Sequence, residues 1–207
     1  MRRPQFIARQ SRRPTGLLGS LLARIMAKET AAENNKALEL LHLNPTDYVL
    51  EIGFGHGRTL AKAAVAASKG LVAGVDISDT MVDMAARYNS ALLAAGRLEI
   101  NSNDGETLSY PDCHFDKAYS VHTVYFWPRP QKVLIETYRV LKRGGMLLLG
   151  FTSNLDKSRA DFPANIYKHY SCAELQHIVE GSGFSDTRFV EHNSSNRRIV
   201  FLSARRP

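Results

Sequence analysis

The sequence contains no apolar run that approaches the roughly 20 residues of a membrane-spanning helix. It also contains only two cysteines, Cys113 and Cys172, which lie far apart and lack the spacing of metal ligands. We therefore expect no spanning helix, no disulfide framework and no bound metal, and we take a reduced, cytoplasmic setting as the default. Both thiols are interpreted as small, partly buried side chains.

Acidic residues are missing from the first 28 positions, which hold seven lysines and arginines. The whole chain has 27 basic and 20 acidic residues, so the rest of the chain carries 20 of each sign. A neutral body argues against a broad nucleic-acid-binding face. Residues 1–28 are instead predicted either to contact something anionic, such as a membrane surface, or to stay solvated.

Helical periodicity begins early in the chain. The first 14 residues are rich in arginine and include Pro4 and Pro14, and we expect them to form a flexible arm. In "TGLLGSLLARIMAKE", apolar residues recur on one helical stripe: Leu17, Leu18, Leu21, Leu22, Ile25 and Met26. A second helix is predicted at about 30–42, before Pro45. We therefore assign 1–43 to an arm with amphipathic helices and 44–207 to the main domain.

Strand and helix patterns alternate through that domain. Apolar strand-like stretches are "YVLEI", "LVAGVD", "RLEIN", "FDKAYSV" and "MLLLGF". Helices are expected at about 58–68, at 79–94 after the cap Ser78, and at 130–141 up to "KRGG". A helix started by Ser171 and two strands joined by "NSSN" follow. The pattern predicts an α/β, Rossmann-like, mostly parallel seven-stranded sheet with helices on both faces and an antiparallel last strand.

A glycine-rich turn follows the first strand in "VLEIGFGHGRTL", with Gly53, Gly55 and Gly57 at alternate positions. Turns of this kind usually hold a nucleotide at the carboxyl edge of a parallel sheet. Arg58 stands where a dinucleotide-binding fingerprint has its third small residue, and no G-K-S or G-K-T ends the turn. These departures argue against NAD and ATP as the bound nucleotide, although both stay open.

Three acidic residues follow the ends of three successive strands: Glu51, Asp76 and Asp104. A carboxylate at position 51 repels a pyrophosphate and favours a positively charged group such as an ammonium or a sulfonium. Asp76 is placed to accept both hydroxyls of a ribose, and Asp104 to accept from an exocyclic amine. The three acids fit a cationic nucleoside better than a polyphosphate.

These motifs, in this order, resemble the class I S-adenosylmethionine-dependent methyltransferases. The stretches that carry the resemblance are "VLEIGFGHG", "GVDIS" with Met81, "NDGETLSYPDCHFD", "FDKAYSVHTVYFW", "RVLKRGGMLLLG" and "YSCAELQHIVEGSGF". Together they span about residues 36–207. The later stretches are similar to the branch that methylates small molecules, loosely like quinone and metabolite methyltransferases. The resemblance agrees with a reversed strand at the end of the sheet.

The resemblance implies S-adenosyl-L-methionine as cofactor and S-adenosyl-L-homocysteine as product. It implies that the methionine part of the cofactor is held by Glu51, Gly53, Gly55 and Gly57, and that the ribose is bound by Asp76. It also implies that Ile77 and Met81 pack on the adenine and that Asp104 and Gly105 meet the adenine edge. Two simpler interpretations stay open. Asp76 is also placed to cap a helix, and Met81 to be an ordinary core residue.

Candidates for the acceptor side follow the fourth strand and the irregular segment 152–170. His122 and Tyr125 are the catalytic candidates, and the predicted substrate contacts are Tyr125, Phe126, Trp127, His169 and Tyr170. A general base adds only about 10²–10⁴-fold, so a methyltransferase can work without one. The alternatives are that His122 only lines the wall, that Phe126 and Trp127 pack the next helix, and that the 169–170 region is a solvated loop.

The expected acceptor is a small hydrophobic or aromatic metabolite. The N-P-P-Y signature of amino-methylating nucleic-acid enzymes is replaced by "SVHTVYF", and a cysteine pair like that of some RNA-methylating enzymes is missing. Three alternatives stay open: a membrane-associated phospholipid or quinone methyltransferase, a non-catalytic module that binds the cofactor, and, because of the basic arm, a nucleic-acid methyltransferase, against which the neutral body argues. The N-terminal helix is interpreted as a lid over the cleft, as a peripheral contact of 1–28 with an anionic membrane, or as an organelle transit peptide. The sequence indicates no oligomeric state.

Overall fold

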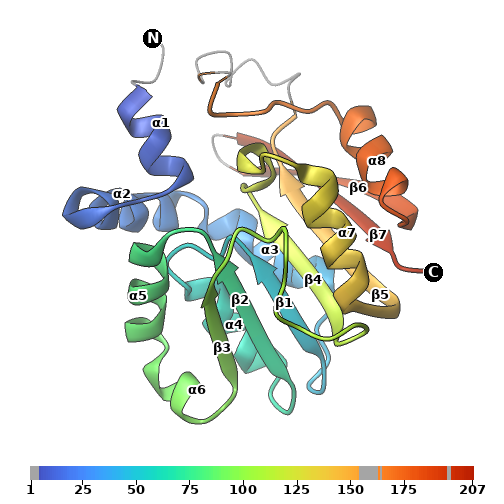
Figure 1. Ribbon diagram of the computed structural model, residues 1–207, viewed down its shortest axis with the longest axis horizontal. Helices are drawn as coiled ribbons and strands as arrows, with labels where there is room; N and C mark the ends of the chain where they lie inside the picture. Colours follow the sequence, from blue (N-terminus) through green and yellow to red (C-terminus); the bar gives the residue numbers. More distant parts are fainter. Residues whose placement is uncertain (1–4, 154–162, 164, 195–196) are drawn as a thin grey trace.

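A seven-stranded sheet runs through the protein in the computed structural model, which describes residues 5–153, 163, 165–194 and 197–207 (Figure 1). The strands are β1 (Tyr48–Ile52), β2 (Leu71–Asp76), β3 (Leu98–Ser102), β4 (Phe115–Val121), β5 (Leu141–Phe151), β6 (Ser185–Ser194) and β7 (Arg197–Arg205), in the order β3-β2-β1-β4-β5-β7-β6. The first five strands pair in parallel, and β7 is antiparallel to β5 and β6. The predicted Rossmann-like fold is confirmed.

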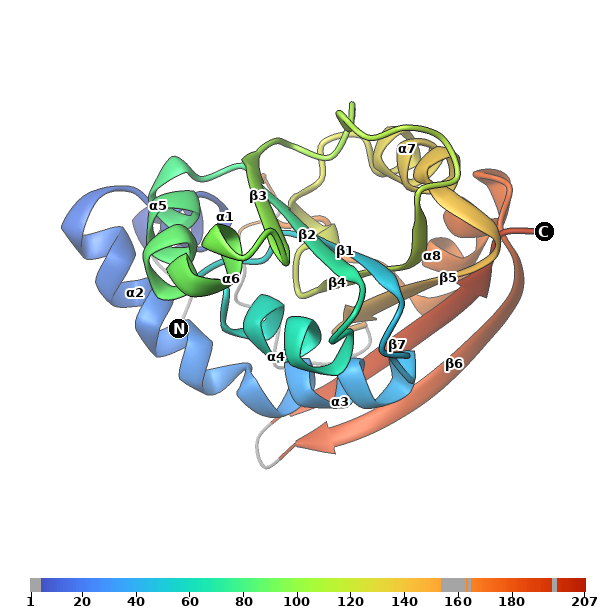
Figure 2. The ribbon, with the colours of Figure 1, turned by 90° about the horizontal axis from the view of Figure 1, so that it is seen from below.

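Helices cover both faces of this sheet (Figure 2). They are α1 (Gln5–Arg12), α2 (Gly16–Glu29), α3 (Ala31–Leu41), α4 (Arg58–Ala66), α5 (Asp79–Tyr88), α6 (Ser90–Ala94), the 3-10 turn η1 (Val124–Phe126), α7 (Pro130–Val140) and α8 (Cys172–Gly181). The buried residues of α7 and α8 join one core cluster, and those of α3 and α4 join the other. Alternate strand residues supply each cluster, as a sheet buried on both sides requires.

Two helix starts confirm the predicted caps. The Ser78 hydroxyl accepts a hydrogen bond from the backbone N–H of Met81 at 3.3 Å, at the start of α5. Ser171 and Glu174 form a reciprocal capping box at the start of α8. Each cap satisfies backbone donors that the first helical turn leaves free.

Four expectations differ from the structure. Residues 5–12 form α1 rather than a flexible arm, because Ala8 and Pro14 are buried against the body. The 79–94 helix is divided at Asn89, whose side-chain amide donates to the carbonyls of Gly57 and Ala85. "KRGG" does not precede the fifth strand but lies inside β5, which starts at Leu141. Cys113 is exposed, because it lies in the turn before β4, whereas Cys172 is half-buried.

Two negative findings concern the described residues. No helix there combines the length and the hydrophobicity needed to cross a bilayer. Within the same residues, no group of three or more histidines, cysteines, aspartates or glutamates is arranged to hold a metal ion.

Candidate active site

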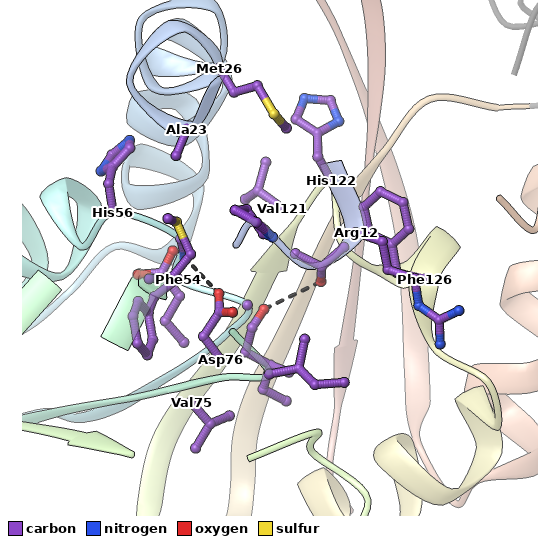
Figure 3. Close-up of a pocket in the computed structure, with 18 of the residues that line it drawn as sticks. Arg12, Ala23, Met26, Phe54, His56, Val75, Asp76, Val121, His122 and Phe126 are labelled. Atoms are coloured by element: carbon purple, nitrogen blue, oxygen red, sulfur yellow. Dashed lines mark hydrogen bonds between the residues drawn. The ribbon is translucent and has the colours of Figure 1, made fainter. Parts of the chain in front are cut away.

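A cleft opens at the carboxyl ends of β1, β2 and β4, between the sheet and the N-terminal helices (Figure 3). Its lining includes ten of the residues predicted from the sequence: Glu51, Gly53, Gly55, Asp76, Ile77, Met81, Asp104, His122, Phe126 and Trp127. The parallel strands all end at this edge of the sheet, which is why residues from separate motifs meet here.

The glycine turn after β1 needs its glycines for two different reasons. Gly53 has φ +81°, and a Cβ there would lie 2.4 Å from Cγ2 of Thr123, so any side chain is excluded. Gly55 has φ +60° and open space within 4 Å of a built Cβ, so its backbone borders the cleft directly. Gly57 does not line the cleft but packs against Ala85 of α5. The turn is therefore fixed at both ends and open in the middle.

Glu51 is an acid buried at the end of β1. Its side chain is 3% exposed, and Oε2 accepts a hydrogen bond from the phenol of Tyr119 at 2.7 Å. Burial, together with the nearby charge of Asp76, raises the pKa of Glu51 to about 8. No cationic side chain of the described residues is hydrogen-bonded to this carboxyl group. A buried acid without a cation favours a ligand that brings one.

Asp76 connects three parts of the site. Its Oδ2 accepts from the backbone N–H of Gly55 at 2.8 Å, and its Oδ1 accepts from the N–H of Ser78 at 2.9 Å. Burial raises the pKa of Asp76, and these two hydrogen bonds oppose the shift. Each carboxylate oxygen accepts more than one hydrogen bond, so two ligand hydroxyls still find acceptors here. The helix cap is Ser78, so Asp76 is free for that role.

The remaining predicted cofactor residues lie around Asp76. Ile77 and Met81 line the cleft, and Met81 is also 2% exposed within the core cluster below it. Asp104 lines the cleft and accepts from the N–H of Glu106 at 2.9 Å. Gly105 lies behind this wall, where a Cβ would contact Val133 and Ile52. Met81 is thus both a core residue and a wall residue.

His122 begins the opposite wall of the cleft. It has φ +60°, a strained conformation for a non-glycine residue, and its N–H donates to the carbonyl of Gly150 at 2.8 Å. Its Nδ1 lies 3.3 Å from the hydroxyl of Tyr125. Tyr125 is 1% exposed, does not line the cleft, and accepts from the N–H of Thr152. The left-handed turn therefore divides the predicted aromatic cluster between the cleft and the core.

His169 and Tyr170 lie outside the lining of the cleft. The Tyr167 ring is 4.8 Å from that of Phe126 and 6.3 Å from that of His169, so residues 165–170 support the aromatic wall from behind. Tyr170 is 8% exposed within the core. Most of the predicted acceptor segment 152–170, namely 154–162 and 164, lies outside the described residues.

Comparisons with known proteins agree on one family. A family model described as "Methyltransferase domain" matches residues 50–149. The uncharacterized methyltransferase YdaC of Bacillus subtilis (strain 168) is 29% identical over 183 residues, which is 88% of this chain and 96% of YdaC. A methyltransferase structure from Aquifex aeolicus superposes with a TM-score of 0.72 at 23% identity, over 84% of this chain and 89% of that one. The chain therefore carries a methyltransferase domain and has the fold of the class I S-adenosylmethionine-dependent methyltransferases.

A further relative of this methyltransferase is a rice protein (Oryza sativa subsp. japonica) named 24-methylenesterol C-methyltransferase 2. It is 29% identical over 147 residues, which is 71% of this chain and 40% of the rice protein. The chain spans less than half the length of most of the curated relatives that it matches. Within the family, the similarity is of the small-molecule type.

The methyltransferase cofactor, S-adenosylmethionine, fits the residues present. The cofactor has an ammonium and a sulfonium for the buried acid Glu51, and a ribose for Asp76. The cofactor's adenine is flat and apolar on its faces, as the walls made by Ile77 and Met81 require. A buried carboxyl group with a raised pKa at this point of the sheet suits a ligand that brings a positive charge.

The N-terminal helices form one wall of the methyltransferase cleft, as the lid interpretation of the sequence expects, but none of the lining residues there was predicted. Eight lining residues come from α1, α2, α3 and their connections: Ser11, Arg12, Pro14, Ala23, Met26, Ala27, Thr30 and Asn34. The hydroxyl of Ser78 donates to the carbonyl of Pro14 at 2.5 Å, which ties this wall to the loop after Asp76. In Figure 3, Met26 lies on the same side of the cleft as His122, away from Asp76. The spacing of Gly19, Ala23 and Ala27 was the available signal, because small residues four apart allow close packing.

His56 was also missed. It lines the cleft beside Gly55, and its Nδ1 accepts from the N–H of Arg58 at 3.1 Å. Burial and the neighbouring Arg58 lower the pKa of His56, so the ring is neutral near pH 7. The glycines on either side of His56 predict a backbone turn, and that pattern gives no indication of a role for this side chain.

Proposed function

We propose that the protein transfers a methyl group from S-adenosylmethionine to a small, hydrophobic or aromatic metabolite. The observation that carries this proposal is the division of the cleft into two sides. Carboxyl groups from Glu51, Asp76 and Asp104 line one side. Aromatic and apolar side chains, among them Phe126 and Trp127, line the other. The polar, cationic methyl donor and the apolar acceptor would thus contact different walls of the cleft.

On the donor side, each group of the cofactor has a proposed partner. Glu51 would accept from the ammonium, Asp76 from the ribose hydroxyls and Asp104 from the adenine amine. Ile77 and Met81 would pack on the adenine faces. The cofactor also carries a carboxylate, which needs a cation. Among the described residues that line the cleft, Arg12 is the one with a permanent positive charge, and we assign the carboxylate to it.

On the acceptor side, orientation is the main contribution of the protein. The cofactor supplies a methyl group that is already activated on a positively charged sulfur. Holding two reactants in line is worth about 7–11 kcal/mol, more than a general base adds. The side chains of Phe126, Trp127 and Met26 would hold the acceptor against the methyl group. His122 is the proposed proton acceptor where the acceptor atom bears a proton, and the nearby Tyr125 hydroxyl orients its ring.

An apolar acceptor also agrees with the rice relative, which its name describes as a sterol C-methyltransferase. The test is incubation of the full chain with methyl-labelled S-adenosylmethionine and a metabolite extract, followed by mass spectrometry. We expect labelled product in the organic phase. Binding of S-adenosylhomocysteine without any labelled product would instead assign the protein as a non-catalytic cofactor-binding module. Label that enters only RNA or protein would overturn the small-molecule proposal.

A prediction for Arg12 tests the carboxylate assignment. Arg12→Gln should weaken S-adenosylhomocysteine binding about tenfold, because it removes a charge-assisted hydrogen bond at a half-exposed site. Calorimetry measures the change.

Arg13→Gln is the matched control, since Arg13 is next in sequence but exposed and lies 3.5 Å from Asp79. Its binding constant should stay within about twofold of the wild type, as for an exposed pair. Equal losses in the two variants would show that the effect is one of general charge, and Arg12 would lose its proposed role.

A further inference from the structure

The orientation of α2 is unusual for a surface helix. Its small residues face inward: Gly19, Ala23 and Ala27 are buried. Most of its large apolar residues face outward, with exposed fractions of 92% for Leu17, 55% for Leu21 and 48% for Ile25. Leu18 is exposed as well, and so is Phe6 on the neighbouring α1. Surface helices normally bury the large residues and expose polar ones.

Close packing explains the inward side. A Cβ at Gly19 would lie 2.8 Å from Oε1 of Gln10 and 2.9 Å from the carbonyl carbon of Pro14. Ala23 and Ala27 line the cleft itself. Leucines on this side would collide with α1 or fill the cofactor cleft. The outward leucines therefore have no place inside the described fold, and contiguous exposed apolar patches of this kind mark interaction sites.

The charges beside the patch indicate what covers it. Arg24 and Lys28 follow Leu17 and Leu21 at helical spacing, so they flank the leucines on the same exposed side. Arg9 on α1 is exposed too. No acidic residue precedes Glu29 in the chain. An apolar stripe with cations beside it is the pattern of a helix that lies in the interface of an anionic membrane.

Other partners fit this surface less well. A symmetric contact between two copies would bring the same basic residues together, and like charges repel. A nucleic acid would pair with the cations but would leave Leu17 and Ile25 against phosphates and water. Figure 1 shows α1 and α2 at the edge of the molecule, next to α5 and away from the C-terminus, so a flat surface can reach them.

We propose that the outer face of α2, with Phe6 of α1, docks on an anionic phospholipid bilayer. Because Ala23, Met26 and Ala27 on the other side of the same helix line the cleft, docking brings the cleft next to the lipid surface. An apolar acceptor dissolved in the bilayer then reaches the aromatic wall without crossing water. Docking itself does not depend on the proposed function, whereas the delivery of an acceptor rests on it.

The test uses the full chain and vesicles of phosphatidylcholine with or without phosphatidylglycerol. Flotation should recover the protein with the anionic vesicles at least tenfold more strongly than with the neutral ones, and added salt should weaken the binding. Substituting Leu17, Leu21 and Ile25 together by serine should reduce vesicle binding more than tenfold. The affinity of the same variant for S-adenosylhomocysteine should be unchanged, which shows that the fold and the cleft are intact.

The matched control replaces exposed apolar residues elsewhere. Val65 on α4 and Ile135 on α7 are 76% and 54% exposed, and their serine variants should bind vesicles like the wild type. Equal binding to neutral and anionic vesicles would overturn the proposal, and so would unchanged binding of the triple variant. A dimer that depends on the three residues, without vesicle binding, would assign the face to a second copy and would also overturn it.

Discussion

Asp76→Ala should abolish detectable binding of S-adenosylhomocysteine at micromolar concentrations of the protein. The carboxylate is buried at the end of β2 and is assigned to both ribose hydroxyls. Hydrogen bonds to a charged group contribute about 1.5–3 kcal/mol each, so the loss of two weakens binding by about 10²–10⁴-fold. Isothermal titration calorimetry measures the change directly.

Asp76 also holds the N–H groups of Gly55 and Ser78, so the variant can disturb the turn itself. Asp76→Asn separates these effects, because the amide keeps the shape and one acceptor oxygen but loses the charge. It should keep the thermal unfolding temperature of the wild type within a few degrees and still lose most of the affinity. Asp79→Ala is the control, since this nearby acid is exposed and pairs with Arg13. Wild-type affinity in Asp76→Asn would remove Asp76 from the cofactor site.

Much of the fold follows from local patterns. The five parallel strands were predictable because each is a short apolar run bounded by turn residues, and the caps at Ser78 and Ser171 are read from the side chain alone. The acids at the strand ends were predictable as a group. Parallel strands end at one edge, so Glu51, Asp76 and Asp104 must meet there whatever the details of packing. The fold and the donor side of the cleft therefore follow from the sequence.

The sequence offered a lid over the cleft as one of three interpretations of the N-terminal helix, but the residues of that wall did not follow, because they depend on long-range contacts. Pro14 and Ser78 are 64 positions apart, and their hydrogen bond is one of the contacts that join the N-terminal helices to the loop after β2. The apolar stripe of α2 predicts a helix but gives the wrong impression of which side is buried. Gly19 packs inward because a side chain there would meet Gln10 and Pro14, and Ala23 and Ala27 face inward onto the cleft. Hydrophobic periodicity indicates that the two faces of a helix differ, but it does not indicate which neighbouring element each face contacts.

The acceptor side was only partly predictable for a related reason. "HTVYFW" is a run of large side chains without a period, so its division into wall and core depends on the backbone. The positive φ of His122 and the η1 turn send Tyr125 into the core and leave Phe126 and Trp127 on the cleft. Neither feature has a signal in these residue types. The roles proposed for the aromatic residues therefore stay predictions until an acceptor is known.

The affinity for S-adenosylhomocysteine should rise about tenfold per pH unit between pH 6 and the pKa of Glu51, and this rise should vanish in Glu51→Gln. In the free protein the pKa of Glu51 is raised to about 8, so the group is mostly protonated at pH 7. A bound ammonium favours the carboxylate, and binding must then release about one proton. Calorimetry in two buffers of different ionisation enthalpy counts that proton. The ligand's own amine also titrates near the upper end of this range, and Glu51→Gln, which keeps that titration, is the correction for it.

Tyr119→Phe tests the cause of the shift, because the phenol donates to Glu51 and opposes the rise in its pKa. Without this donor the pKa of Glu51 should rise further, and the pH profile of binding should move to higher pH with an unchanged slope.

The stability of the free protein should also depend on pH through the protonation of Glu51. A pKa above the unfolded value means that the folded state holds the proton more tightly, so this contribution is complete below about pH 4.5 and is lost as the pH rises through about 8. Unfolding temperatures of the wild type should fall over that range more steeply than those of Glu51→Gln. Parallel curves for the two proteins, together with a binding constant independent of pH, would show that the carboxyl group at the end of β1 is ionised before the cofactor arrives.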